Sequence, residues 1–172
     1  MTISMFVNFG DAIKGECEDK GHEGWCEITA LEQDFENKVS PLAPRKKDSK
    51  GAVKCDHSEI DITKVVDSAS ALLMNACWLG ETLDEVVIEC FRAYAGKDGV
   101  SKPINYFSIT LKKVVIRELE YSVGEGDLAS EDLKLVYNSA AYLYHQMDHE
   151  NGTVTKRAGT ASRTVGSGNW KD

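Results

Sequence analysis

Five cysteine and histidine side chains in the first third of the sequence could hold a metal ion. They are Cys17, His22, Cys26, Cys55 and His57. Zinc accepts thiolate sulfur and imidazole nitrogen as ligands, but the spacing Cys17-x4-His22-x3-Cys26 lacks the two-residue gaps typical of zinc modules. Cys26 also alternates with Ile28 and Ala30, as a buried strand thiol does. We expect no metal and no other cofactor, and a Cys/His metal-binding module stays an alternative.

No arrangement of residues predicts catalysis. His145 and His149 would share one face of a helix, but they lie on either side of the boundary between a strand-like run and a turn, which favours a solvated pair. The sequence has no G-x-S-x-G nucleophile motif. Gly124-Glu125-Gly126 lacks the third glycine and the lysine of a phosphate-binding loop, so we expect a hairpin turn. We predict no catalytic residue and a protein that is not an enzyme.

Composition narrows the class of protein further. The 172 residues carry 20 Lys and Arg against 28 Asp and Glu, a net charge of −8, which argues against a nucleic-acid binder. No apolar run approaches the ~20 residues of a membrane span. The first nine residues lack a basic segment and a cleavage-like site, so we expect no general secretory signal. Five scattered cysteines indicate reduced thiols.

Hydrophobic alternation predicts a mainly β protein. Strand-like runs occupy residues 3–9, 25–35, 60–62, 85–94, 104–121 and 133–147. In the longest run, Leu111, Val115 and Leu119 are predicted to share one face. In the run 25–35 the apolar positions shift by one residue, which indicates a bulge.

A single helix is expected at about residues 68–79. Its apolar stripe consists of Ala69, Leu72, Leu73, Ala76 and Leu79. Asp67 or Ser70 can cap its start, and Gly80 suits its end. The strands are apolar on both faces, and one short helix covers little of that surface. We therefore expect a homo-oligomer.

Three segments resemble a known family. Gly15-Glu16-Cys17-Glu18-Asp19-Lys20-Gly21-His22-Glu23-Gly24 resembles the opening G-E-S-x-D-x-x-H-x-G of the haemolysin-coregulated protein (Hcp) family of bacterial type VI secretion. The segments 67–80 and 106–116 resemble its helix motif D-x-x-S-P-x-L-x-x-A-C-x-x-G and a following strand motif. Cys17 stands where the family usually has serine, and Ala71 where it has proline.

The resemblance implies a β-barrel of two antiparallel sheets with one flanking helix. Residues 1–150 would form a single barrel domain with an extended loop at 37–56, and residues 151–172 a C-terminal strand or tail. It also implies a structural subunit rather than an enzyme. Six copies would form a ring with a central channel, and rings would stack into an expelled tube that carries effectors.

Partners and location also follow from the resemblance. The partners would be further copies of the chain, the sheath proteins, the spike protein and effector cargo, with no nucleic acid and no membrane insertion. The protein would be cytoplasmic while assembled and secreted without a signal peptide. A tail-tube protein of a phage-like contractile particle remains an alternative.

A basic segment suggests how rings would stack. Arg45, Lys46, Lys47, Lys50 and Lys54 outweigh Asp48 and leave a local charge of +4. We predict that this segment contacts an acidic face of the next ring, formed by Glu16, Glu18 and Asp19.

Overall fold

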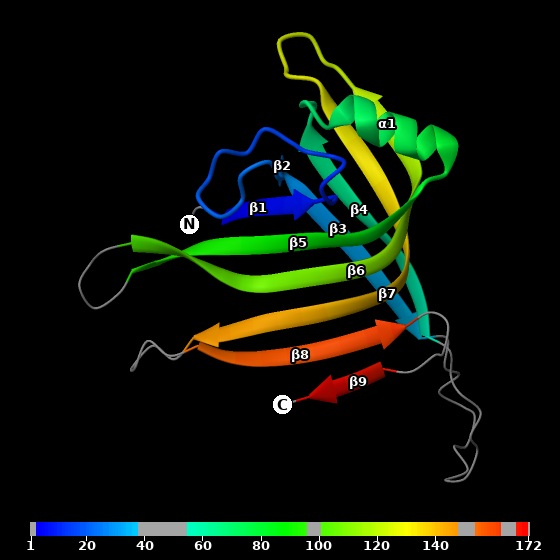
Figure 1. Ribbon diagram of the computed structural model, residues 1–172. Helices are drawn as coiled ribbons and strands as arrows, with labels where there is room; N and C mark the ends of the chain where they lie inside the picture. Colours follow the sequence, from blue (N-terminus) through cyan, green and yellow to red (C-terminus); the bar gives the residue numbers. More distant parts are fainter. Residues whose placement is uncertain (1–2, 38–54, 96–100, 148–153, 163–167, 172) are drawn as a thin grey trace.

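The protein folds as one curled antiparallel sheet with a single helix among the described residues (Figure 1). The structure, a computed structural model, describes residues 3–37, 55–95, 101–147, 154–162 and 168–171. The strands are β1 (Ile3–Asn8), β2 (Cys26–Ile28), β3 (Ala30–Asn37), β4 (Cys55–Val65), β5 (Thr82–Ala95), β6 (Ser101–Ser122), β7 (Ser130–Met147), β8 (Val154–Ser162) and β9 (Gly168–Lys171). The helix α1 spans Ser70–Leu79. The mainly β class with one helix is thus confirmed.

Strand β7 divides the sheet into two flanks. The strand order is β2-β1-β5-β6-β7-β4-β3, and β8 and β9 continue from β7 on a separate branch. The first part of β7, Ser130–Leu135, pairs with β4, and the later part, Ser139–Met147, pairs with β8. The described strands therefore form one continuous sheet, whose two flanks take the place of the two expected sheets.

The curl brings the two ends of the strand order together. β2 pairs with β1 and β3 pairs with β4, yet only Thr29 separates β2 from β3 in the chain. The backbone N–H of Thr29 donates to the carbonyl oxygen of Thr63 on β4 at 2.8 Å. The predicted shift of apolar positions in residues 25–35 thus falls at the change of pairing partner. A separate register shift lies between Gln33 and Phe35.

The face assignment along β6 was wrong at Val115, whereas Leu119 packs against the core with Leu111 as predicted, after a register shift between Ile116 and Glu118. Val114 and Ile116 are buried with Leu111, whereas Val115 is only partly buried. The cause is Lys113, whose φ of 53° lies in the left-handed region. Two successive sets of cross-strand neighbours on β5, β6 and β7 therefore face outward, and buried sets lie on either side of them. These outward-facing sets are Glu85, Lys112 and Ser139, and then Asp84, Lys113 and Asn138.

The helix begins and ends close to its predicted bounds. Gly80 closes it with a φ of 64°, a conformation that glycine adopts without steric cost. Ala69 occupies the N-cap without a side-chain hydrogen bond, and the carboxylate of Asp67 accepts from the N–H of Ala69 at 2.9 Å. Leu73 and Ala76 are buried, but Leu72 and Leu79 of the predicted stripe are exposed.

Replacing Lys113 with glycine is expected to leave stability unchanged or higher. The left-handed conformation costs a non-glycine residue ~1–2 kcal/mol, whereas the exposed ion pair to Asp84 contributes little because solvent screens it. The neighbouring Lys112→Gly is the matched control, because it removes an equivalent pair to Glu85 without relieving any strain. Urea unfolding should find Lys113→Gly more stable than Lys112→Gly by ~1 kcal/mol or more. Equal stabilities would contradict the role of Lys113 in the bend.

Candidate functional site

The structure places only the acidic half of the predicted stacking interface. Arg45, Lys46, Lys47, Lys50 and Lys54 lie outside the described residues. Glu18 and Asp19 are exposed in the loop between β1 and β2. Glu16 is exposed as well, but its Oε1 accepts from the backbone N–H of Ser68 at 3.0 Å. Glu18 and Asp19 are therefore open to a partner, while Glu16 already holds the start of the helix.

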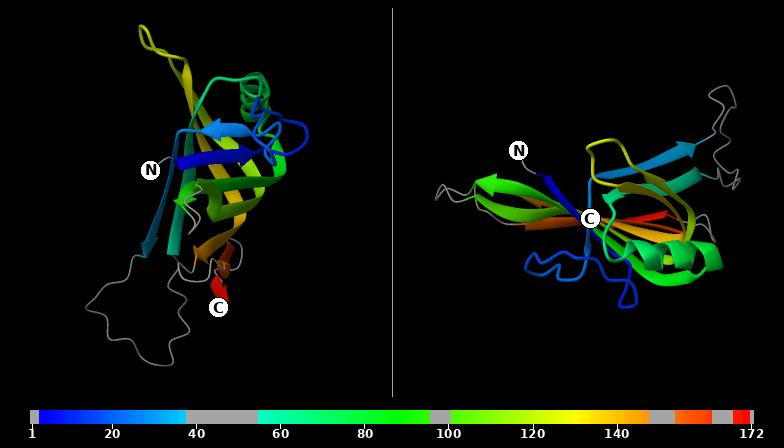
Figure 2. Two further views of the ribbon diagram at one scale, coloured as in Figure 1. Left: turned by 90° about the vertical axis from the view of Figure 1, so that its left-hand side faces the viewer. Right: turned by 90° about the horizontal axis from the view of Figure 1, so that it is seen from above.

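The loop between β1 and β2, residues 9–25, covers the outer face of β1 and β5. In the view from above it lies on the same side of the sheet as α1 (Figure 2). The ring of His22 stacks on Phe6 with centroids 4.4 Å apart and meets the edges of Trp25 and Phe91. His22 Nε2 also lies 2.9 Å from the carboxylate of Glu89 on β5. Part of the second apolar face of the strands is thus covered within the same chain.

The candidate metal ligands Cys17, His22 and Cys26 have structural surroundings instead. Cys17 and Cys26 are free buried thiols, and His22 binds Glu89. Within the described part of the chain, no three His, Cys, Asp or Glu side chains are grouped to hold a metal ion. Nothing is described of the side chains of Cys55 and His57, nor of His149. His145 Nδ1 lies 3.0 Å from the carbonyl oxygen of Asn105.

Gly15 explains why the loop motif begins with glycine. A Cβ atom at this position would lie 2.4 Å from the carbonyl oxygen of Trp25 and 2.6 Å from Cys26 Sγ. Its neighbours are backbone and a buried side chain, which have little room to move. The loop can therefore pack this closely on β2 only where residue 15 has no side chain.

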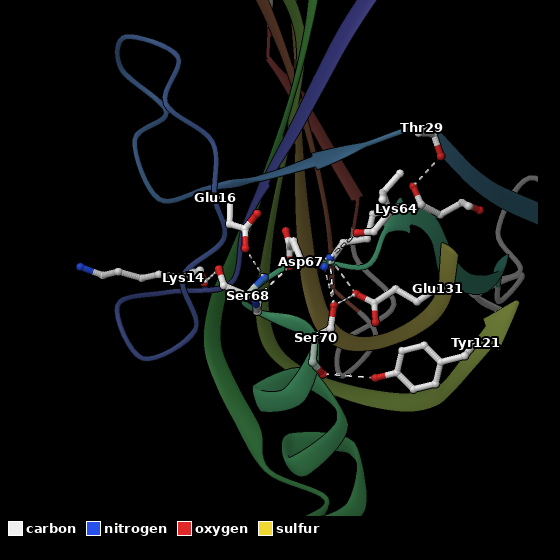
Figure 3. A network of polar contacts seen from close by, with 12 residues as sticks. Lys14, Glu16, Thr29, Lys64, Asp67, Ser68, Ser70, Tyr121 and Glu131 are labelled. Atoms are coloured by element: carbon white, nitrogen blue, oxygen red, sulfur yellow. Dashed lines mark hydrogen bonds and ion pairs between the residues drawn. The ribbon is translucent and has the colours of Figure 1, made fainter. Parts of the chain in front are cut away.

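A buried ion pair joins β4 and β7 beneath the start of the helix (Figure 3). Lys64 and Glu131 are directly opposed in the two strands and have no exposed side-chain surface. Lys64 Nζ lies 2.7 Å from Glu131 Oε1 and 2.8 Å from Asp67 Oδ1. It also donates to the carbonyl oxygen of Val65 at 2.9 Å. The ammonium group is thus surrounded by acceptors, as a buried charge requires.

The same network fixes the helix and the loop. The hydroxyl of Ser70 donates to Glu131 Oε1 and accepts from the backbone N–H of Asp67, both at 2.9 Å. Ser68 donates to Glu16 and to the carbonyl oxygen of Lys14. The two motifs at 15–24 and 67–80 therefore meet in space, and their polar residues are structural. Lys64 and Glu131 went unnoticed in the sequence because each stands alone in a strand pattern.

Burial and the carboxylates have opposite effects on Lys64. Burial alone would lower its pKa, but the hydrogen bonds and charges of Asp67 and Glu131 outweigh burial and raise the pKa above its usual value. Burial raises the pKa of Cys26 to about 12, and the nearby carboxylate of Asp67 adds to the effect. Burial likewise raises the pKa of Cys90 to about 11. At neutral pH Lys64 therefore stays charged and these thiols stay protonated.

The strongest exposure of large apolar side chains lies on the helix and the hairpin that joins β6 to β7. On α1 the exposed fractions are 46% for Leu72, 47% for Met74, 85% for Trp78 and 61% for Leu79. Val123 and Leu128 are exposed in the hairpin. The sequence had suggested the strand faces instead. The difference arises because the curl of the sheet and the loop 9–25 bury much of the strand surface.

A shallow polar groove crosses β3, β4, β6 and β7. Its volume is about 260 Å³, and its lining includes Glu32, Asp61, Arg117 and Lys134. Arg117 pairs with Glu59, and Lys134 pairs with Glu118 at 2.8 Å. Both basic groups of the groove are thus engaged by carboxylates, and no nucleophile–base pair is evident in its lining.

This arrangement defines a class: a curled antiparallel β-barrel protein whose motif residues maintain the fold and whose apolar surface lies on a flanking helix. No described helix has the length and apolar character needed to span a bilayer. The model of the family "Type VI secretion system effector, Hcp" matches residues 6–144. The chain belongs to this family, and it is therefore a tube or effector protein of type VI secretion, a structural class that assembles with itself as rings.

Solved structures share the fold at low sequence identity. A type six secretion system protein aligns with a TM-score of 0.79 and 19% identity over 98% of this chain and 100% of its own. Hcp1 from Salmonella typhimurium aligns with a TM-score of 0.72 and 15% identity over the same shares. The secreted protein Hcp3 from Pseudomonas aeruginosa gives 0.59 and 20%, over 93% of this chain and 96% of its own. No curated protein matches the sequence.

Breaking the buried ion pair is expected to destabilise the fold strongly. Lys64→Met leaves Glu131 buried without its partner and should cost ~3–5 kcal/mol of unfolding free energy. The control Lys134→Met removes an exposed pair to Glu118 and should cost far less, because solvent screens exposed ion pairs. Adding Glu131→Leu to Lys64→Met should recover part of the loss.

The pH dependence follows from the raised pKa of Lys64. The stabilisation is fully present below the ordinary lysine pKa of about 10.5 and is lost as pH rises through the folded pKa, which lies higher. Urea unfolding of the wild type and of Lys64→Met, at pH 7 and above pH 10.5, measures both the cost of the substitution and its dependence on pH. Equal costs for Lys64→Met and Lys134→Met would contradict the network.

Thiol labelling should separate the described cysteines. Cys26 and Cys90 are buried with raised pKa values, whereas Cys77 on α1 is half-buried. Because the thiolate is the reactive form, iodoacetamide at pH 8 should modify Cys77 first, and Cys26 and Cys90 only after unfolding. Peptide mass spectrometry measures the order in which the cysteines are modified. Labelling of Cys26 as fast as Cys77 in the folded protein would contradict this burial.

Proposed function

We propose that six copies of this chain form a closed ring and that rings stack head to tail into the inner tube of a type VI secretion system. The match of the Hcp family model to residues 6–144 carries the proposal. The curled sheet that closes at Thr29 supports it, because it makes each copy a rigid wall element. The polar residues of both motifs serve packing, which agrees with a structural subunit rather than an enzyme. A phage-like tail tube is not better supported.

The proposed partners follow from this assembly. They are further copies of the chain, the sheath around the tube, the spike at its tip and effector cargo in the channel. The tube would assemble in the cytoplasm and leave the cell by type VI secretion. Residues 1–150 would form the barrel domain and residues 151–172 its C-terminal strand region, in which β8 and β9 continue the sheet from β7.

Stacking is proposed to use opposite charges. The segment containing Arg45, Lys46, Lys47, Lys50 and Lys54 would contact the acidic loop of the next ring, where Glu18 and Asp19 are exposed. Glu16 would contribute as part of the same acidic loop while its Oε1 accepts from the N–H of Ser68. Exposed ion pairs contribute ~0–1 kcal/mol each and are screened by salt, so stacks would be reversible.

The test compares ring mass with stacking. Light scattering should give about 114 kDa, six times the 19.0 kDa chain. Lys46→Glu with Lys47→Glu should keep this mass but reduce tube length in electron micrographs and secretion, and Glu18→Lys with Asp19→Lys should restore both. Lys102→Glu, at an exposed lysine elsewhere, is the control. A monomer at tens of micromolar would overturn the ring; unchanged stacking would overturn only the charge contact.

A further inference from the structure

The outer side of α1 is an apolar surface without a partner in the described chain. We call Leu72, Met74, Trp78 and Leu79 the α1 apolar face; all four are exposed, and Trp78 is the most exposed large apolar side chain among the described residues. The opposite side of the helix places Leu73 and Ala76 in the core. A helix that is apolar on both sides is typical of an element buried on both sides.

The α1 apolar face lies in a segment without ionisable side chains. From Ser68 to Gly80 the chain contains no Asp, Glu, Lys, Arg or His, and no other run in the sequence is as long. Each copy carries a net charge of −8, so two copies repel each other at most of their surfaces. Contact between copies is therefore least unfavourable where charge is absent. A cationic or acidic partner would have no group to bind here.

The area is sufficient for a subunit contact. With large side chains taken at roughly 200 Å² each, the four exposed fractions correspond to about 500 Å² of apolar surface. Stable interfaces bury about 800 Å² per partner, of which the apolar centre is the larger part. Isolated apolar side chains need no explanation, but a patch of this size usually marks an interaction site.

The helix presents this surface rigidly. Ser70 at its start binds Glu131, and Tyr121 donates to the carbonyl oxygen of Ser70 (Figure 3). Gly80 fixes its end. Trp78 is a suitable anchor, because a large aromatic side chain loses little conformational entropy on binding. The face is thus formed before association.

We propose that the α1 apolar face is the contact to the neighbouring copy within the ring. This inference rests on the proposed ring assembly and names the surface that forms it. In a closed ring the contact is heterologous, so the face packs on a different surface of the next copy and each copy supplies both surfaces. Trp78, with Met74 one turn before it, lies at the centre of the contact in energetic terms, and Leu72 and Leu79 form a second apolar strip beside this pair on the outer side of the helix.

The experiment replaces Trp78 in the full-length chain and measures mass by light scattering over a concentration series. Trp78→Glu should shift the protein from ring to smaller species at concentrations where the wild type is fully assembled, raising the midpoint of assembly at least tenfold. Tyr144→Glu is the matched control, since it adds the same charge at an exposed apolar position near the other end of β7 and should leave the midpoint unchanged. Leu72→Gln with Trp78→Gln repeats the test without added charge. Circular dichroism and thermal unfolding verify that each variant is folded.

The outcomes separate the two proposals. Loss of the ring in folded Trp78→Glu, with an intact ring in Tyr144→Glu, supports the assignment. An intact ring in folded Trp78→Glu overturns the assignment. This holds even if the variant loses stacking or secretion, because the α1 apolar face would then contact another ring or the sheath. A wild-type chain that forms no ring overturns the proposed function itself. If Trp78→Glu is unfolded, the uncharged double variant decides in the same way.

Discussion

The buried pair between Lys64 and Glu131 is the interaction on which the arrangement of the remaining parts depends. It spans adjacent strands and, through Asp67 and Ser70, fixes where the helix starts. Through Ser68 and Glu16 the same contacts hold the loop that precedes β2. A buried pair stabilises only where its hydrogen-bonding groups are satisfied. Lys64 meets this condition, while Glu131 Oε2 has no partner among the described residues. The pair therefore contributes mainly to positioning, because it determines how the helix and the loop before β2 lie against the sheet.

The second constraint is the bend of the sheet. A regular strand would keep alternate residues on one face, but the extra outward-facing set at Asp84 and Lys113 exchanges the faces of β5, β6 and β7 together. The bend lets these long strands surround a core that includes residues of β2 and β4. It also explains why the strands look apolar on both faces. Within one strand, the buried positions before the bend and those after it belong to opposite alternating sets of residues.

The sequence was sufficient for the strands and the helix because these depend on local alternation and on residues such as Gly80. It was not sufficient for the bend, because nothing in the sequence indicates that Lys113 adopts a left-handed backbone conformation. The pair of Lys64 with Glu131 and the contact of His22 with Glu89 each join positions 67 residues apart in the chain, which periodicity does not reveal. The cysteines and His22 were candidate metal ligands because the sequence gives their residue types but not their neighbours in space. Glu16 looked free for the same reason.

Two kinds of surface imply two strengths of contact in the proposed assembly. About 500 Å² of apolar surface, at roughly 25 cal/mol per Å², corresponds to ~12 kcal/mol before the costs of association are subtracted. Exposed ion pairs between rings contribute ~0–1 kcal/mol each and weaken as salt rises. Contacts within a ring would thus persist under conditions in which stacks separate. Since every copy brings a charge of −8, the lateral contact has to be uncharged, and the basic segment at 45–54 is the part of the sequence that can offset repulsion along the tube. A tube built in this way comes apart into intact rings, not into single chains.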